Sequence, residues 1–158
     1  MKIWQFESYV LFLQKIYKIH IKMLLNIEIS NFFSVKEKVC IDFRAANIHT
    51  QRAKELADNV IDWNGTKVLK SIGLFGPNAS GKTSILKAIS FCCRMILDSY
   101  LYNEGVTFNF EPFKFDGWQN KPSKFLIDFV CDDVEYEYSF EITRERILSE
   151  CLLSHPVK

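Results

Sequence analysis

The sequence has no long apolar run and no excess of charge of one sign. Nowhere do 18 apolar residues follow one another, so no transmembrane helix is expected. Because 20 basic residues nearly balance 19 acidic ones, the formal net charge is only +1. A chain with this net charge does not, as a whole, attract nucleic acid or an anionic membrane electrostatically. In residues 104–145 the balance is −6, from 4 basic and 10 acidic residues, which argues against a nucleic-acid platform there.

The cysteines lack the spacing of a disulfide framework or of a metal site. There are 5 of them, an odd number, and no two are spaced as CxxC. The 3 histidines stand far from any cysteine cluster, so no zinc site is expected. Scattered cysteines are typical of small core residues in a reducing compartment, and we therefore expect a cytoplasmic protein. These cysteines are Cys40, Cys92, Cys93, Cys131 and Cys151.

The chain does hold enough apolar material for one domain. Of its 158 residues, 48% are hydrophobic and 25% are charged, values typical of soluble globular proteins and unlike those of disordered chains. Aromatic residues reach 15%, and 14 of them are Phe. This length does not comfortably hold two domains, so we expect one.

The first 22 residues allow two interpretations. Apolar residues from Ile3 to Tyr17 fall at helical spacing, which favours an amphipathic helix. Alternatively, translation begins at Met23 and residues 1–22 are an upstream extension. A signal peptide is disfavoured, because the apolar run is short and no cleavage site follows. We divide the chain into this extension, which is given no function, and a domain over residues 23–158.

Alternating apolar residues predict strands at both ends of the domain. Near its start, two stretches flank a polar turn and predict an antiparallel hairpin, with Leu25, Ile27 and Ile29 on one face of the first strand. Near its end, three stretches predict a β-meander, in which Asp132 and Asp133 turn the chain. These stretches are residues 24–32 and 39–43, then 125–131, 134–142 and about 146–153.

The middle of the chain is less regular. Residues 51–61 allow a helix, the Asn-Gly pair at 64–65 predicts a turn, and residues 68–75 read as a short apolar strand. After a glycine-rich loop, residues 83–97 carry apolar side chains at three-and-four spacing, which predicts a helix with one apolar stripe. Residues 103–123 contain Pro and Gly and are expected to form a loop.

The glycine-rich loop fits G-x-x-x-x-G-K-[ST], the Walker A phosphate loop. Its glycines let the backbone curl with amides inward, and the helix that follows aims its N-terminal amides at the same anion. Lys82 supplies an ammonium group for the β- and γ-phosphates of ATP, and the hydroxyl of Thr83 is placed to ligate Mg²⁺. The expected ATP-binding residues are Gly76, Pro77, Asn78, Ala79, Ser80, Gly81, Lys82, Thr83 and Ser84.

With its flanks, this loop resembles that of bacterial AAA-family ATPases of the ABC/SMC/OLD type, which occur in phage-defence and abortive-infection systems. The sequence GPNASGKT follows a Leu-Phe strand end and precedes SILKAI, and IEISNFFSVKEKVCIDF looks like the first hairpin of that family. EPFKFD, before the acidic meander, is also similar. The resemblance covers residues 23 to about 155. It implies an α/β P-loop NTPase fold, the N-terminal lobe of an SMC-like, ABC-type head with a mixed sheet.

Several parts that hydrolysis needs in that family are missing from this sequence. There is no LSGG-type signature and no switch His. Gln119 lies in the region of a Q-loop, but we expect it to be part of a surface loop instead. Residues 129–133 (FVCDD) come nearest to a Walker B strand, but they end in Asp-Asp and lie in an alternating, half-buried strand, so a hairpin turn is expected. We therefore expect a partial domain, truncated before the signature and Walker B, whose own ATP hydrolysis is uncertain.

The resemblance also implies partners. They are the missing C-terminal lobe or a second chain that supplies it, a head-to-head dimer when the head is complete, and nucleic acid only through the complete assembly, with no membrane. We expect a solvated face rather than a nucleic-acid contact at the basic residues Lys36, Lys38 and Arg44. The face meant for the missing lobe is expected to expose apolar residues.

Two other functions remain open for the sequence. A P-loop kinase or GTPase is disfavoured, because no N-K-x-D motif occurs and the last third is rich in strands. A degenerate, non-hydrolysing interaction module fits the missing Walker B, although the intact Gly-Lys-Thr of the loop argues against decay.

Overall fold

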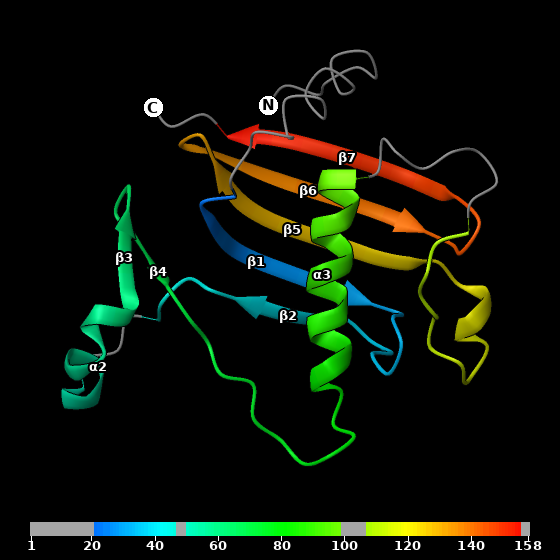
Figure 1. The fold of residues 1–158 in the computed structure, drawn as a ribbon, viewed down its shortest axis with the longest axis horizontal. Coiled ribbons are helices and arrows are strands. Elements are labelled where there is room, and N and C mark those ends of the chain that lie inside the picture. Colours follow the sequence, from blue (N-terminus) through cyan, green and yellow to red (C-terminus); the bar gives the residue numbers. More distant parts are fainter. Residues whose placement is uncertain (1–20, 47–49, 99–106, 156–158) are drawn as a thin grey trace.

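An antiparallel sheet carries one long helix on one of its faces, and a small hairpin lies beside it (Figure 1). The computed structural model describes residues 21–46, 50–98 and 107–155. The helix expected near the N-terminus, from Ile3 to Tyr17, lies outside these residues. The division of the chain at Met23 stays a prediction.

In the larger sheet, β1 (Met23–Ser30) lies between two antiparallel strands. On one side β1 pairs with β2 (Val39–Asp42), which confirms the predicted hairpin. On the other side it pairs with β5 (Ser123–Cys131), followed by β6 (Val134–Ile142) and β7 (Ile147–His155). The strand order is β2-β1-β5-β6-β7, so the predicted meander at the end of the chain is also confirmed.

A β-bulge in β1 changes which face its first residues present. Leu24 and Asn26 stand opposite consecutive residues of β5, so Leu25 is an extra residue in the ladder. Leu25 therefore packs in a separate small cluster, away from Ile27 and Ile29. The prediction that all three share one face is wrong, because the inserted residue shifts the alternation by one position.

The helix α3 (Lys82–Asp98) confirms the predicted helix to within one residue at each end. Its apolar stripe packs on the sheet, where the ring centroid of Phe91 lies 5.3 Å from that of Phe125 and 5.8 Å from that of Phe32. Large apolar side chains buried in this way contribute about 1.5–3 kcal/mol each, which holds α3 against the sheet. The buried residues of the helix are Ala88, Phe91, Cys92, Met95 and Ile96.

The small hairpin consists of β3 (Val60–Trp63) and β4 (Thr66–Leu69). The Asn-Gly pair at 64–65 turns the chain with φ angles of 50° and 79°, as predicted. The helix expected over residues 51–61 is wrong in its second half. It ends early, as α2 (Gln51–Glu55), because the residues from Val60 onward pair with β4 instead.

The strand expected over residues 68–75 is also wrong for most of its length. Only its first two residues belong to β4, and the chain then runs as an open coil to α3 (Figure 1). No described strand lies beside residues 72–75, so they join neither sheet. The expected mixed sheet is therefore antiparallel throughout the described residues.

The end of β5 is buried on both faces, unlike the half-buried strand that its alternation predicted. Asp128 is 9% exposed and Val130 is fully buried, because Val130 packs with Met23, Leu25 and Val68 on the face opposite α3. The turn at Asp132 and Asp133 is confirmed, and both residues adopt positive φ.

All five cysteines are free, and the expectation of core packing holds for Cys92 and Cys131, whereas Cys40 is exposed. None of the helices among the described residues has the length and apolarity needed to cross a membrane.

Candidate nucleotide-binding site

Lys82 points its ammonium group into the loop that precedes α3. Its Nζ donates hydrogen bonds of 2.7 Å to the carbonyl oxygens of both Gly76 and Pro77, and lies 3.2 Å from Oγ of Ser80. The loop therefore curls around its own lysine. In the structure, these carbonyls accept the hydrogen bonds that the ammonium group would otherwise donate to an anion.

The glycines of the loop stand where a side chain would collide or strain the backbone. Gly81 has φ of +92°, and a Cβ there would lie 3.3 Å from Oγ of Ser34. A Cβ on Gly76 would lie 2.8 Å from Oγ of Ser80, too close for an unshifted side chain. Ala79 also has positive φ, of 63°, so the loop turns sharply twice before the helix.

The loop ends at the N-terminus of a 17-residue helix. The first bond of the helix runs from the amide of Ile85 to the carbonyl of Gly81, so the amides of the residues before Ile85 are left to other partners. No acidic residue occupies the first turn, and the positive end of the helix dipole is therefore not neutralised by its own side chains. This end of the helix attracts an anion.

Thr83 lies in the first turn of α3, is exposed, and makes no side-chain hydrogen bond to another described residue. Its hydroxyl is free to ligate a hard cation such as Mg²⁺, which prefers oxygen ligands. The fit to Mg²⁺ rests on this hydroxyl, which directly follows the glycine-rich loop and Lys82 in the chain. Among the described residues, no group of three or more His, Cys, Asp or Glu side chains forms a metal site.

The turn between β1 and β2 touches the loop, a contact that the sequence pattern did not reveal. Oγ of Ser34 lies 2.7 Å from Oγ of Ser84, in the first turn of α3. One residue earlier, the ring of Phe33 lies 4.5 Å from Nζ of Lys87, a cation–π contact. The Asn-Phe-x-Ser sequence marked this turn, but nothing in it indicated a position some 50 residues later in the chain.

Asn31 holds this turn in place from inside the fold. Its side chain is fully buried and its Nδ2 donates to the carbonyls of Trp118, Lys121 and Pro122, at 3.0, 2.8 and 3.2 Å. Its Oδ1 accepts a hydrogen bond of 2.9 Å from the amide of Phe113. One side chain thereby fixes the β1–β2 turn to the irregular chain before β5, which includes a 3-10 turn at Trp118–Asn120.

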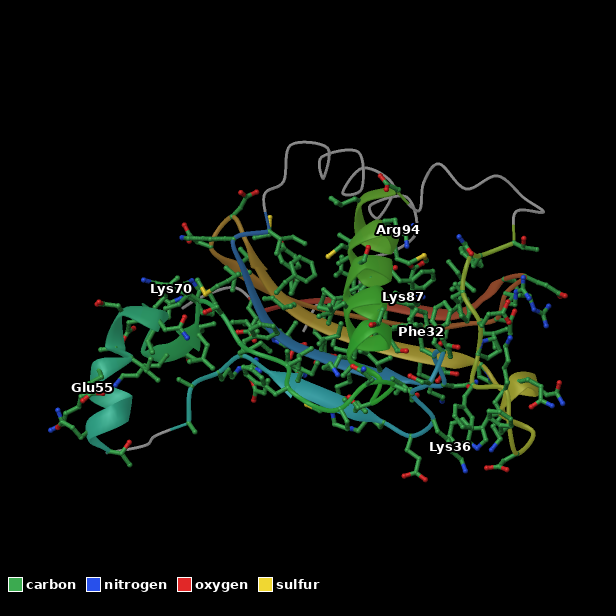
Figure 2. The ribbon with its side chains drawn as sticks, turned by 60° about the horizontal axis from the view of Figure 1, so that its bottom comes forward. Phe32, Lys36, Glu55, Lys70, Lys87 and Arg94 are labelled. Carbon is green, nitrogen blue, oxygen red and sulfur yellow. The ribbon has the colours of Figure 1, made fainter. Side chains whose placement is uncertain are left out.

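The basic residues at 36, 38 and 44 all lie in ion pairs. Lys36, which follows the β1–β2 turn (Figure 2), pairs with Asp116. Lys38 pairs with Glu28. Arg44 lies within 3.6 Å of carboxylates on three different segments. The contacts of Lys36 and Lys38 agree with the solvated face that the sequence favoured, whereas Arg44 is partly buried and one of its partners, Asp128, is buried.

The residues that come nearest to a Q-loop and to a Walker B motif lie away from the glycine-rich loop. Gln119 is exposed and lines an open cleft of about 390 Å³ with Arg144 and Arg146, at the end of the sheet. Asp133, at the β5–β6 turn, pairs with Lys22. Neither residue makes a described contact with the loop that holds Lys82.

An α/β fold with antiparallel sheets, in which a glycine-rich loop leads into a helix N-terminus, is compatible with a nucleotide-binding protein. A family profile described as "AAA domain, putative AbiEii toxin, Type IV TA system" matches residues 71–156. The match covers more than half of the chain, which therefore belongs to this family, the AAA-family ATPases of the abortive-infection type. No match was found among curated proteins or among solved structures.

Proposed function

We propose that the chain binds Mg·ATP through residues 76–84, as the N-terminal lobe of an SMC-like, ABC-type P-loop ATPase head. Membership of an AAA family supports nucleotide binding in general. The observation that carries the specific proposal is the position of Lys82, whose ammonium lies 2.7 Å from two loop carbonyls at the start of α3. A cation held there meets the phosphates of a bound nucleotide.

In this proposal the triphosphate of ATP replaces the loop carbonyls as the hydrogen-bond acceptor of Lys82. The β- and γ-phosphates take the ammonium hydrogens that the carbonyls of Gly76 and Pro77 accept in the structure. Loop amides and the N-terminal amides of α3 donate to the same phosphates. The hydroxyl of Thr83 ligates Mg²⁺, which neutralises phosphate charge when bound.

We further propose that hydrolysis requires a second lobe, either a C-terminal lobe or a second chain that supplies it. This proposal is supported by the sequence, from which the signature and Walker B motifs are missing. A head-to-head dimer and contact with nucleic acid belong to that complete assembly. The scattered cysteines support a cytoplasmic setting for this protein.

The test is a calorimetric titration of the purified chain with Mg·ATP. Wild type is compared with Lys82→Ala and with Lys87→Ala, a matched control that removes a lysine from the same helix. Because hydrogen bonds to charged groups contribute about 1.5–3 kcal/mol, we expect Lys82→Ala to weaken binding about 10- to 100-fold. Lys87→Ala should bind nearly as wild type. Saturable binding that is equal in all three proteins would contradict the assignment of the site to this loop.

A further inference from the structure

The cleft at the end of the large sheet gathers basic side chains from two separate segments. Lys121 comes from the irregular chain before β5, whereas Arg144 and Arg146 come from the turn between β6 and β7. Figure 1 shows both segments at the same end of the sheet. The volume of the cleft is about 390 Å³. Sites for small molecules commonly enclose about 300–1,000 Å³, so the cleft has the size of such a site.

Hydrogen bonds within the protein fix both walls of the cleft. The buried side chain of Asn31 donates to three carbonyl oxygens within residues 118–122 and so holds the first wall. In the second wall, the amide of Thr143 donates to the carbonyl oxygen of Arg146 at 2.9 Å. The amide of Arg146 donates in return to Oγ1 of Thr143 at 3.2 Å. A site whose walls are already ordered loses little conformational entropy when a ligand binds.

The positive charge of the cleft is only partly neutralised. Arg144 pairs with Glu111 at 3.2 Å, and Glu145 is an acidic residue of the lining. No carboxylate of the described residues forms an ion pair with Lys121 or Arg146. Three basic side chains against two acidic ones leave the cleft positive. Cations that line one cleft raise the local concentration of anions there.

The inner part of the cleft is apolar. Phe110 and Ile142 belong to its lining and are at most 2% exposed, so they form its floor. The hydroxyl of Ser123, which is also buried there, already donates to the carbonyl oxygen of Asn31. An apolar floor with a few charged groups around it is the usual composition of a small-molecule site. A ligand that fits both parts has an anionic group and an apolar group.

The surroundings of the cleft favour a small anion over a long one. Residues 104–145 carry 10 acidic and 4 basic side chains, a balance of −6. A strand of nucleic acid or an anionic membrane extends beyond the cleft and meets this acidic part of the chain, whereas a small molecule stays within the positive cleft.

Phosphate suits the cations of the cleft better than carboxylate does. A phosphate monoester carries about 1.5–2 negative charges at neutral pH, so it can engage two cations at once. The planar guanidinium of Arg146 matches the geometry of phosphate oxygens, and the ammonium of Lys121 adds a second positive charge.

We propose that this cleft binds a small phosphorylated organic molecule. The phosphate accepts hydrogen bonds from Lys121 and Arg146, and the apolar group of the ligand packs on Phe110 and Ile142. The site is additional to the proposed ATP site, because residues 76–84 contribute nothing to its lining.

The probe is phenyl phosphate, titrated into the full chain in phosphate-free buffer and followed by the NMR chemical shifts of the backbone amides. The comparison ligands are inorganic phosphate, benzyl alcohol and a short single-stranded oligothymidylate. Every titration is repeated in Lys82→Ala, which removes the ammonium group of the glycine-rich loop. The cleft variants are Lys121→Gln and Arg146→Gln. Their matched controls, Lys114→Gln and Arg94→Gln, each remove one exposed positive charge outside the cleft.

We expect saturable binding of phenyl phosphate in wild type and in Lys82→Ala, with shifts at residues 119–121 and 143–146. Each cleft variant should weaken this binding about fivefold, because it removes one exposed, charge-assisted hydrogen bond, and the controls should leave it unchanged. Inorganic phosphate should bind more weakly than phenyl phosphate, since it has no apolar group. Benzyl alcohol should not bind, since it has no charge.

Three results would overturn the proposal. They are loss of phenyl phosphate binding in Lys82→Ala, equal effects of the cleft variants and their controls, and oligothymidylate binding that is tighter than that of phenyl phosphate and lost in Arg146→Gln. In the last case the occupant would be nucleic acid. Shifts at the cleft in a wild-type protein that binds no Mg·ATP would refute the proposed function alone. Binding of Mg·ATP at residues 76–84 without shifts at the cleft would refute the cleft site alone.

Discussion

Exchanging Asn31 for aspartate tests whether one side chain holds the β1–β2 turn against the rest of the fold. The two side chains have nearly the same shape, and both tolerate the left-handed backbone that Asn31 adopts, with φ of 56°. The variant Asn31→Asp therefore leaves the backbone and the packing unchanged. It replaces the Nδ2 donor, which serves three carbonyl oxygens at 2.8 to 3.2 Å, with a carboxyl oxygen.

The expected loss of stability follows from the burial of Asn31. The site is completely buried, so the three carbonyls lose a donor and face a carboxylate oxygen in its place. An unsatisfied buried group costs about 1–3 kcal/mol, and neighbouring losses overlap, so we expect a loss of about 3–5 kcal/mol in the free energy of unfolding. The loss should shrink as the pH falls, because a protonated carboxyl regains one donor.

The measurement is urea unfolding of the two proteins, followed by tryptophan fluorescence and circular dichroism at neutral pH. Asn120→Asp is the matched control, since Asn120 is exposed in the segment to which Asn31 is bonded. We expect this control to change stability by less than about 0.5 kcal/mol. If Asn31→Asp costs no more than its control, the turn is held by other contacts and this account of Asn31 is wrong.

Three further changes test the core, an acidic group and the contact beside the loop. Phe91→Ala should lower the free energy of unfolding by about 3–5 kcal/mol in the same urea assay, because it empties the centre of the contact between α3 and the sheet. Burial raises the pKa of Asp128, although the charge of Arg44 opposes the shift. The folded protein therefore takes up this proton more readily than the unfolded chain and gains stability as the pH falls towards that raised pKa. Asp128→Asn should remove this gain, which urea midpoints measured from neutral to mildly acidic pH will detect. Ser34→Ala removes the hydrogen bond to Ser84 and should weaken Mg·ATP binding about fivefold with little change in stability, as calorimetry can measure; unchanged binding would exclude the turn from the site.

The elements that the sequence predicted well are those decided by neighbours along the chain. The stripe of α3 repeats every three to four residues and appears in the structure within one residue of its expected ends. The strands β5 to β7 follow from alternation, and the turn at 64–65 follows from an Asn-Gly pair. The residues expected to hold phosphate likewise came from a contiguous motif, whose binding role stays a prediction.

Other features depend on contacts between residues far apart in the sequence, so only the tertiary structure decided them. The bulge at Leu25 is set by the register with β5, which no local pattern contains. Residues 72–75 have the composition of a strand, yet a strand exists only where a partner accepts its hydrogen bonds, and the described chain provides none. Asn31 and Ser34 gained their roles from groups 50 to 91 residues away. The sequence by itself determined the local elements and the loop motif, because short-range hydrogen bonding and apolar periodicity suffice for them. The tertiary structure decided which strands pair and which surfaces stay open.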